Sequence, residues 1–227
     1  MYLTQIALDP RHPSVRRDLA SAYELHRTLR RAASDAEEER LLYRLEPGQP
    51  GGPHPTLLVQ TLARPDWSFL DAGYALALRG PKPFDLALRE GQPLAFRLIA
   101  NPTRRAVSAR DATKKTRVPL KKDTKTPNKP EHRTYFEWLL DQAHRCGFNL
   151  PHSDDGVPAV QAAPFHIVTR KGVGGDPSRM HRITLFGVRF DGVLTVTDPD
   201  RLVEAVRRGI GPAKAFGFGL LSLAPAR

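Results

Sequence analysis

The segment SAYELHRTLRRA, residues 21–32, brings together side chains that can carry out acid–base chemistry and bind anions. Tyr23, His26, Arg27 and Arg30 follow one another at helical intervals, so we expect them to share the outward face of a helix. A histidine titrates near neutral pH, and arginine pairs with phosphate and carboxylate groups. This face is therefore a candidate catalytic surface for an anionic substrate.

A helix that begins at Ser21 is needed to present that face. Ser21 followed by Glu24 has the spacing of a capping box, and the leucines and alanines of the segment form an apolar stripe that would pack on a core. Two simpler interpretations stay open on the residues alone. His26 is one of eight histidines and could be an ordinary surface side chain, and Tyr23 could be a packing residue.

The charge of the chain favours a polyanionic partner, with nucleic acid first. Its 227 residues carry 35 Lys and Arg against 24 Asp and Glu, a formal net charge of +11. A basic protein that is only soluble, or that binds an anionic membrane surface, is the alternative. No apolar run approaches the roughly 20 residues that cross a bilayer and no signal-peptide pattern opens the chain, so we expect a cytoplasmic protein with no membrane partner. The single cysteine, Cys146, offers no disulfide and no zinc-finger spacing, and we expect no metal and no small-molecule cofactor.

Much of the positive charge falls in one segment, between Asn101 and Tyr135. It holds eleven Lys or Arg residues, Arg104 and Arg105 among them, against three carboxylates. The segment has no apolar periodicity, so we expect a mobile loop that orders on RNA or a partner, or else a solvated linker.

The hydrophobic pattern predicts two rounds of β-α-β-β-α-β order. In the first round we expect strands at 2–8, 40–46, 56–63 and 81–88, a loop before the helix at 21–32, and a second helix at 65–76 capped by Asp66. In the second we expect a strand from 92, a helix at 132–148 closed by Gly147, a strand at 163–171, a hairpin at Asp191-Gly192 within 182–198, a helix at 199–209 and a strand at 217–223. The prediction is an α+β protein of two tandem ferredoxin-like (RRM-like, βαββαβ) domains with antiparallel sheets, residues 1–90 and 91–227.

A glycine-rich segment precedes the last predicted strand. Its glycines lie at four positions, with a lysine between them: Gly209, Gly211, Lys214, Gly217 and Gly219. The spacing and the preceding helix exclude a dinucleotide fingerprint. Glycines let backbone N–H groups approach an anion, so phosphate or an RNA backbone suits this loop and the arginines before it, Arg207 and Arg208. A tight helix-to-strand crossing is the structural alternative.

These motifs together resemble one protein family. SAYELHRTLRRA, LIANPTRR, FDGVLTVTDPDRL and GIGPAKAFGFGLLSLAP are similar to the CasE family, the repeat-RNA endoribonucleases of type I-E CRISPR systems, over nearly the full chain. The resemblance implies that His26 is the catalytic histidine, with Tyr23 beside it and Arg31 as a weaker catalytic candidate. It also implies that Arg170 and Lys171 lie on a hairpin that grips an RNA stem and that residues 209–219 form the family's glycine-rich loop.

The resemblance further implies metal-independent cleavage of a CRISPR repeat RNA hairpin. The 2′-hydroxyl would attack the neighbouring phosphate and give 2′,3′-cyclic phosphate and 5′-hydroxyl ends, with Arg27, Arg30 or Arg31 stabilising the phosphate. The enzyme would stay on its product as part of the multisubunit Cascade complex. Whether His26 or Tyr23 is the acid or the base stays open.

A non-catalytic RNA-binding protein with two RRM-like modules is the competing hypothesis. It predicts aromatic side chains on the central strands of the sheets for stacking bases. The FGFG run at residues 216–219 falls in the predicted loop instead, which weakens this alternative.

Overall fold

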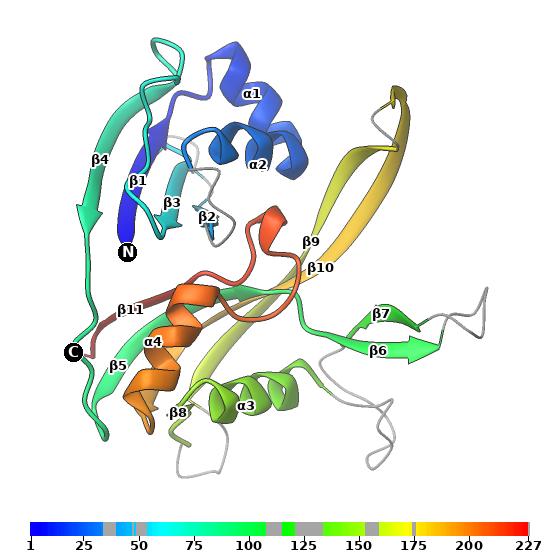
Figure 1. Ribbon diagram of the computed structural model, residues 1–227. Helices are drawn as coiled ribbons and strands as arrows, with labels where there is room; N and C mark the ends of the chain where they lie inside the picture. The colour runs from blue at the N-terminus through cyan, green and yellow to red at the C-terminus, as the bar shows by residue number, and fades with distance from the viewer. Residues whose placement is uncertain are drawn as a thin grey trace.

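The described residues form two large antiparallel sheets, each covered by helices, and one separate two-stranded pair (Figure 1). The computed structural model describes residues 1–33, 40–46, 48, 54–107, 115–120, 134–152, 159–173 and 176–226. The side chains of residues 107, 115, 116, 170–173 and 176–181 also lie outside the description. The α+β class predicted from the sequence is confirmed.

The N-terminal sheet has four strands in the order β2-β3-β1-β4. Its elements in chain order are β1 (Tyr2–Leu8), α1 (Pro13–Ala20), α2 (Ala22–Arg30), β2 (Leu42–Glu46), β3 (Thr56–Thr61) and β4 (Ala75–Pro83). Strand β1 pairs antiparallel with β3 and β4, which is the strand order of a ferredoxin-like fold. Leucines of α2 pack with Ile6, Leu8 and Val59 beneath it, so α1 and α2 cover one face of this sheet.

The C-terminal sheet repeats this order and contains two much longer strands, β9 and β10. Its elements are β5 (Pro93–Ala100), α3 (Tyr135–Arg145), β8 (Phe148–Asn149), β9 (Val160–Val173), β10 (Asp176–Val196), α4 (Pro199–Arg208), the 3₁₀ turn η2 (Lys214–Phe216) and β11 (Leu221–Pro225). The order is β11-β5-β10-β8, and β9 also pairs with β10. Strands β9 and β10 extend beyond the sheet as a long hairpin that reaches toward α1 and α2 (Figure 1).

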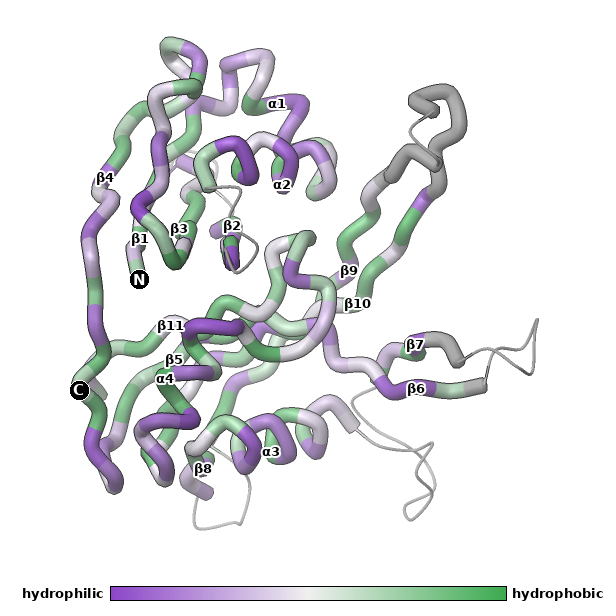
Figure 2. Tube along the Cα trace, viewed as in Figure 1, coloured by the Kyte–Doolittle hydropathy of each residue, from purple (hydrophilic) through white to green (hydrophobic). Residues whose placement is uncertain are grey.

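Amphipathic patterning holds the helices on the sheets. Helix α3 begins at a capping box in which Thr134 and Glu137 each bind the other's backbone N–H. Its Trp138 and Leu139 pack on Phe96 and Phe190 of the sheet. In Figure 2, hydrophilic and hydrophobic residues alternate along α2 and α3, as expected for helices with one buried face.

Two predictions for the first round are wrong. Residues before Ser21 form helix α1 rather than a loop, because Pro13 occupies its first turn and the His12 ring accepts the Ser14 N–H at 3.3 Å. The expected helix at 65–76 is absent from this described stretch, because Asp66 folds back onto Ser68 in a tight turn. The last strand consequently comes earlier than predicted, at Ala75–Pro83 rather than 81–88.

The predicted hairpin at Asp191-Gly192 is also wrong, since β10 runs straight through it. Asp191 and Gly192 pair with β5 on one side and β9 on the other. A Cβ at Gly192 would come within 2.7 Å of the Ala159 carbonyl oxygen, so the glycine serves close strand packing. The Asp191 carboxylate pairs with Arg97 and Arg189 instead of forming a turn.

Part of the basic segment is ordered, contrary to the expectation of a mobile loop. Strands β6 (Thr103–Val107) and β7 (Lys115–Pro119) form an antiparallel pair of their own. Leu120, which follows β7, is buried in the core of the C-terminal sheet and anchors the pair. Residues 108–114 and 121–133 lie outside the described residues.

Candidate functional site

The N-terminus of α2 is fixed by its cap and by β9. The Ser21 hydroxyl accepts the Glu24 N–H at 3.4 Å, as the capping-box spacing predicts. The Glu24 carboxylate pairs with Arg27 at 3.0 Å. Thr169 of β9, a buried residue, hydrogen-bonds the Ser21 hydroxyl at 3.3 Å and accepts the Tyr23 N–H at 3.4 Å. The start of the helix is thereby held against the long hairpin.

His26 lies half-buried on α2 with one ring nitrogen enclosed by protein. Its Nδ1 atom is buried and has no hydrogen-bond partner among the described residues. Burial, with a smaller contribution from the charge of Arg30, lowers the pKa of His26 below its ordinary value. Because that ordinary value is about 6.5, the imidazole is mostly neutral at pH 7.

A basic groove of about 410 Å³ lies beside His26. Four guanidinium groups and one carboxylate share its lining with the histidine: Arg17, Arg27, Arg30, Arg31 and Glu24. Tyr23 is half-buried on the same helix, three residues before His26, at the spacing of helical neighbours. The groove therefore combines a titratable imidazole with an excess of cations, which suits a phosphate group.

Arg31 reaches the groove from the C-terminal end of α2. It is exposed, and its guanidinium carbon lies 4.4 Å from the centre of the Phe69 ring. Stacking on an aromatic face restrains the side chain while its N–H groups stay available.

The glycine-rich loop lies next to this helix and is closed by its own backbone. Ile210 N–H donates to the Gly219 carbonyl at 2.9 Å, and Gly219 N–H donates to Ile99 of β5 at 2.7 Å. All four glycines have positive φ, between +72° and +91°. A Cβ at Gly217 would come within 3.1 Å of the Tyr43 ring. The loop and α2, which are far apart in sequence, therefore meet at Tyr43.

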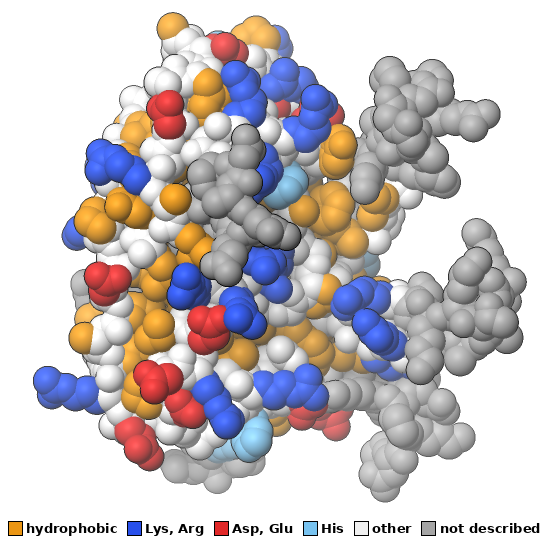
Figure 3. Space-filling view, viewed as in Figure 1, with side chains coloured by type: hydrophobic (Ala, Val, Ile, Leu, Met, Phe, Trp, Pro, Cys, Tyr) orange, Lys and Arg blue, Asp and Glu red, His pale blue; other side chains and the backbone are white. Residues whose placement is uncertain are grey.

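Positive charge gathers around the loop and the β6–β7 pair. The pKa of Lys214 is lowered by burial and then by the charges of Arg40 and Arg117. Arg105 pairs in register with Arg117 across β6 and β7, which places two like charges side by side. Figure 3 shows Lys and Arg side chains collected on this face of the molecule. Such crowding favours a polyanion as the partner.

The other predicted binding residues are placed as follows. Arg207 and Arg208 are exposed in the last turn of α4, and Arg208 pairs with Glu204. Arg104 is half-buried on β6. Arg170 and Lys171 lie on β9 directly after Thr169, and their side chains are outside the description.

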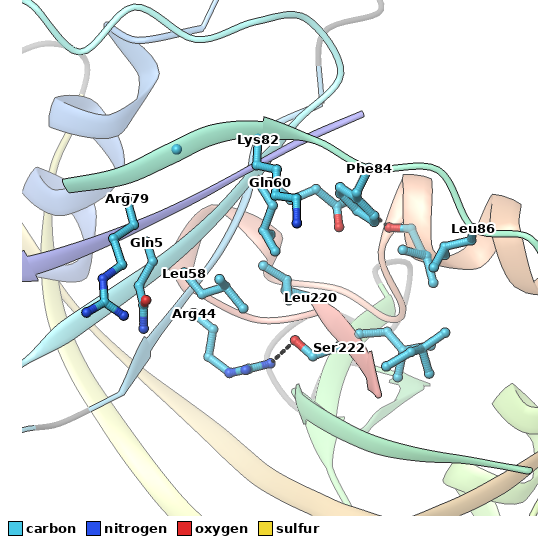
Figure 4. A pocket seen from close by; sticks show the side chains of 15 residues that line it. Gln5, Arg44, Leu58, Gln60, Arg79, Lys82, Phe84, Leu86, Leu220 and Ser222 are labelled. Carbon is cyan, nitrogen blue, oxygen red and sulfur yellow. Dashed lines mark hydrogen bonds between the residues drawn. The ribbon is translucent and has the colours of Figure 1, made fainter. Parts of the chain in front are cut away.

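A second cleft, of about 560 Å³, separates the two sheets on the face away from α2 (Figure 4). Arg44 of β2 crosses it from the N-terminal sheet and donates to the Ser222 hydroxyl of β11 at 2.8 Å. Its Nε pairs with Glu46 at 2.7 Å, and Glu46 also binds Arg97 of β5. This charge network ties the sheets together.

Replacing Arg44 with alanine is expected to lower the free energy of unfolding by about 2 kcal/mol, because it removes the hydrogen bond to Ser222 and the ion pair with Glu46. The side chain of Arg44 is only 6% exposed. The matched control is Arg201→Ala, which removes an exposed pair with Asp198 and should cost less than about 1 kcal/mol because solvent screens it. Urea denaturation would measure both, and equal losses would contradict the prediction.

Within the described ranges, no three His, Cys, Asp or Glu side chains cluster as a metal site requires. Among the same residues, no helix is long and apolar enough to cross a membrane.

Comparison with known proteins identifies the family. A family model described as CRISPR associated protein matches residues 1–225. The chain belongs to this family. One member, the CRISPR-associated endoribonuclease Cse3 of Thermus thermophilus, is 46% identical over 99% of this chain and 100% of its own length. The CRISPR system Cascade subunit CasE of Escherichia coli is 33% identical over 63% of this chain and 64% of its own.

A solved member of the CRISPR-associated family has the same fold. The structure of CRISPR endoribonuclease Cse3 bound to 19 nt RNA matches with a TM-score of 0.82 and 43% identity, covering 99% of this chain and all of that one. The resemblance to the CasE family and the prediction of tandem ferredoxin-like domains are both confirmed.

Sequence reasoning missed two residues of this site. Tyr43 and Thr169 carry no motif, and each contributes by contacting α2 from a different sheet. The available sequence signal is that Tyr43 and Arg44 are adjacent in a predicted strand, so their side chains point to opposite faces. The structure buries both, which makes β2 unusual.

Proposed function

We propose that this protein is an endoribonuclease that cleaves CRISPR precursor RNA at repeat stem-loops and stays bound to the product within a Cascade complex. The observation that carries the proposal is its 46% identity, over the whole length of both chains, to a CRISPR-associated endoribonuclease. Its similarity to an RNA-bound Cse3 structure and to a Cascade subunit supports the RNA and the other Cascade subunits as partners.

His26 is the catalytic base in this proposal. It takes the proton of the 2′-hydroxyl, the 2′-oxygen bonds to the adjacent phosphorus, and the bond from phosphorus to the 5′-oxygen breaks. The departing 5′-oxygen takes a proton from Tyr23 or water, which leaves a 2′,3′-cyclic phosphate and a 5′-hydroxyl. The lowered pKa of His26 supports the base role, because a base must be unprotonated before it acts.

Arginines stabilise the negative charge that grows on the phosphate. Arg31, held over Phe69, is the third catalytic residue of the proposal, and Arg27 and Arg30 bind neighbouring phosphates. Fixed cations at the position where charge develops lower the barrier without reorganisation. Protein groups thus cover the base, the charge stabiliser and, with Tyr23, a candidate acid.

The remaining predicted residues form the RNA-binding surface. The glycine-rich loop, with Gly209, Gly211, Gly217 and Gly219, lets its backbone approach the RNA and presents Lys214 to it, and Arg207 and Arg208 extend the basic surface. Arg104, Arg105, Arg170 and Lys171 contact the stem from the β6–β7 pair and the long hairpin. An A-form stem is read through its shape and phosphates, which suits separate basic elements.

We also propose that residues 1–90 and 91–227 are the two domains. We further propose that the protein works in the cytoplasm, where it meets the CRISPR precursor RNA. Each range contains one complete large sheet with its own helices, and the β6–β7 pair belongs to the second range. Gly91, with φ of +77°, stands between them.

The non-catalytic RNA-binding hypothesis remains the competitor. It requires exposed aromatic side chains on a sheet face. Among the described residues the exposed large hydrophobic side chains are Leu76, Leu78, Leu140 and Val168, none of them aromatic. This favours the enzyme.

The proposal is tested by incubating the wild-type protein with a labelled repeat hairpin RNA in excess EDTA. We expect a single cut whose upstream product ends in a 2′,3′-cyclic phosphate, detected because phosphatase releases phosphate only after acid opens the ring. A hairpin with a 2′-deoxy substitution at the cut is the matched control and should bind without being cut. Tight binding of the unmodified hairpin with no cleavage would instead establish the passive RNA-binding function.

A further inference from the structure

Tyr43 joins the helix that carries His26 to the glycine-rich loop. The side chain lies on β2 and is 1% exposed. Its hydroxyl lies 3.2 Å from the carbonyl oxygen of Ala22, in the first turn of α2, and 3.2 Å from that of Ala215, in the loop. The single hydroxyl proton of Tyr43 is thus shared between two carbonyl oxygens. One belongs to α2 of the N-terminal half, and the other belongs to the loop that leads into β11 of the C-terminal sheet.

The Tyr43 ring contacts both elements as well. It stacks on the His26 imidazole with 6.3 Å between ring centres and 21° between planes. The ring also lies against Gly217, where an added Cβ would sit 3.1 Å from it. Only a glycine leaves room for the loop to come this close.

His26 has little else to orient it. Catalytic histidines are commonly held by a hydrogen bond to the ring nitrogen that does not react. Here Nδ1 is buried and unpaired in the described part of the chain. The Tyr43 ring, nearly parallel to the imidazole, is therefore the contact that can restrain its orientation.

We infer that Tyr43 is a positioning residue, which fixes the His26 ring by stacking and, through its hydroxyl, sets the distance between His26 and the RNA-binding loop. This inference rests on the proposed endoribonuclease function. Positioning matters because a displacement of about 1 Å in a reacting group can cost about 100-fold in rate. Tyr43 itself touches no substrate in this role.

Tyr43→Phe keeps the stacked ring and removes the link to the loop. We expect the single-turnover cleavage rate at saturating hairpin RNA to fall about tenfold, with the Kd for RNA changed by less than about threefold. Tyr43→Leu also removes the aromatic face, and we expect a fall of about 100-fold. Loss of that face exposes the His26 imidazole to water. The inflection in the pH–rate profile of Tyr43→Leu should therefore lie at higher pH than in the wild type.

Tyr74→Phe is the matched control. Tyr74 is another buried tyrosine, directly before β4, and its hydroxyl donates to Asp18 of α1 at 2.9 Å. We expect Tyr74→Phe to lose about as much thermal stability as Tyr43→Phe and to cleave the hairpin RNA within about twofold of the wild-type rate.

The ¹³Cε1–¹H resonance of His26, measured without RNA, separates this inference from the proposed function. We expect Tyr43→Phe and Tyr43→Leu to move that resonance and its titration midpoint, and Tyr74→Phe to leave both unchanged. A Tyr43→Phe protein with wild-type saturating rate, or one impaired only in Kd, would overturn the positioning role. Loss of cleavage by the wild type would overturn the endoribonuclease proposal, and the resonance would still test the contact.

Discussion

Replacing His26 with alanine is expected to reduce the single-turnover cleavage of repeat hairpin RNA by about 1,000-fold. General acid–base catalysis contributes about 10²–10⁴-fold, and no other described titratable base lines the groove apart from Glu24, which is engaged by Arg27. RNA binding should stay within about threefold of wild type, because the imidazole is mostly neutral at pH 7 and the arginines remain. Quenched-flow cleavage and filter binding would measure the two quantities.

The pH dependence of kcat/KM gives an independent check on the same residue. The pKa of His26 is lowered by burial and by Arg30, so the neutral base form predominates above about pH 6.5. The value of kcat/KM should therefore rise with pH in the acidic range and level off near neutrality. An inflection above pH 7 would contradict the base assignment.

His144→Ala is the control for that experiment. His144 is exposed on α3, away from the groove, and its loss should leave the rate within about twofold. Equal losses from the two substitutions would show that neither histidine acts chemically.

Replacing Gly219 with alanine is expected to lower the free energy of unfolding by about 3 kcal/mol and to weaken cleavage at least about tenfold. Gly219 has φ of +91°, and a Cβ there would lie 2.9 Å from the Ile210 carbonyl oxygen. Backbone strain alone costs about 1–2 kcal/mol, and the close contact with backbone adds to it. Because Gly219 closes the loop through Ile210 and Ile99, the substitution must shift the loop itself.

Gly91→Ala separates the energetic cost of backbone strain from that of a close steric contact. Gly91 has a similar φ of +77°, but no atom lies within 4 Å of an added Cβ. It should lose only about 1 kcal/mol and cleave normally. Chemical denaturation measures the stabilities, and hairpin cleavage measures the function. If the two variants lost equal stability, the close packing of Gly219 would not matter.

The sequence by itself determined the elements whose periodicity and caps are local. Ser21 caps a helix where its side chain predicted, and Gly147 closes the helix that it was expected to close, in a conformation that favours glycine. The order of these elements was enough for the fold class. It was also enough to place His26 on a helix whose leucines are buried.

Where a local sequence signal and tertiary packing favoured different conformations, the tertiary structure determined which one formed. Asp191-Gly192 has the composition of a turn, yet in β10 the neighbouring strands require the glycine, because a side chain would strike Ala159. Asp66 has the composition of a helix cap, yet the buried Trp67 and Tyr74 hold that segment in turns over the sheet. Burial and strand pairing outweighed propensity in both places.

The candidate site shows the same division between what the local sequence determines and what tertiary packing determines. The chain specified the proposed catalytic face and the glycine-rich loop separately, about 180 residues apart, as the numbers of His26 and Gly209 show. Tertiary packing brought them together through Tyr43 and held α2 against β9 through Thr169. It also buried one nitrogen of His26, and burial lowers the pKa of that side chain. The residue types allowed the chemistry. Desolvation and long-range contacts, which depend on where distant segments lie, determined the protonation and the orientation of the group that performs it.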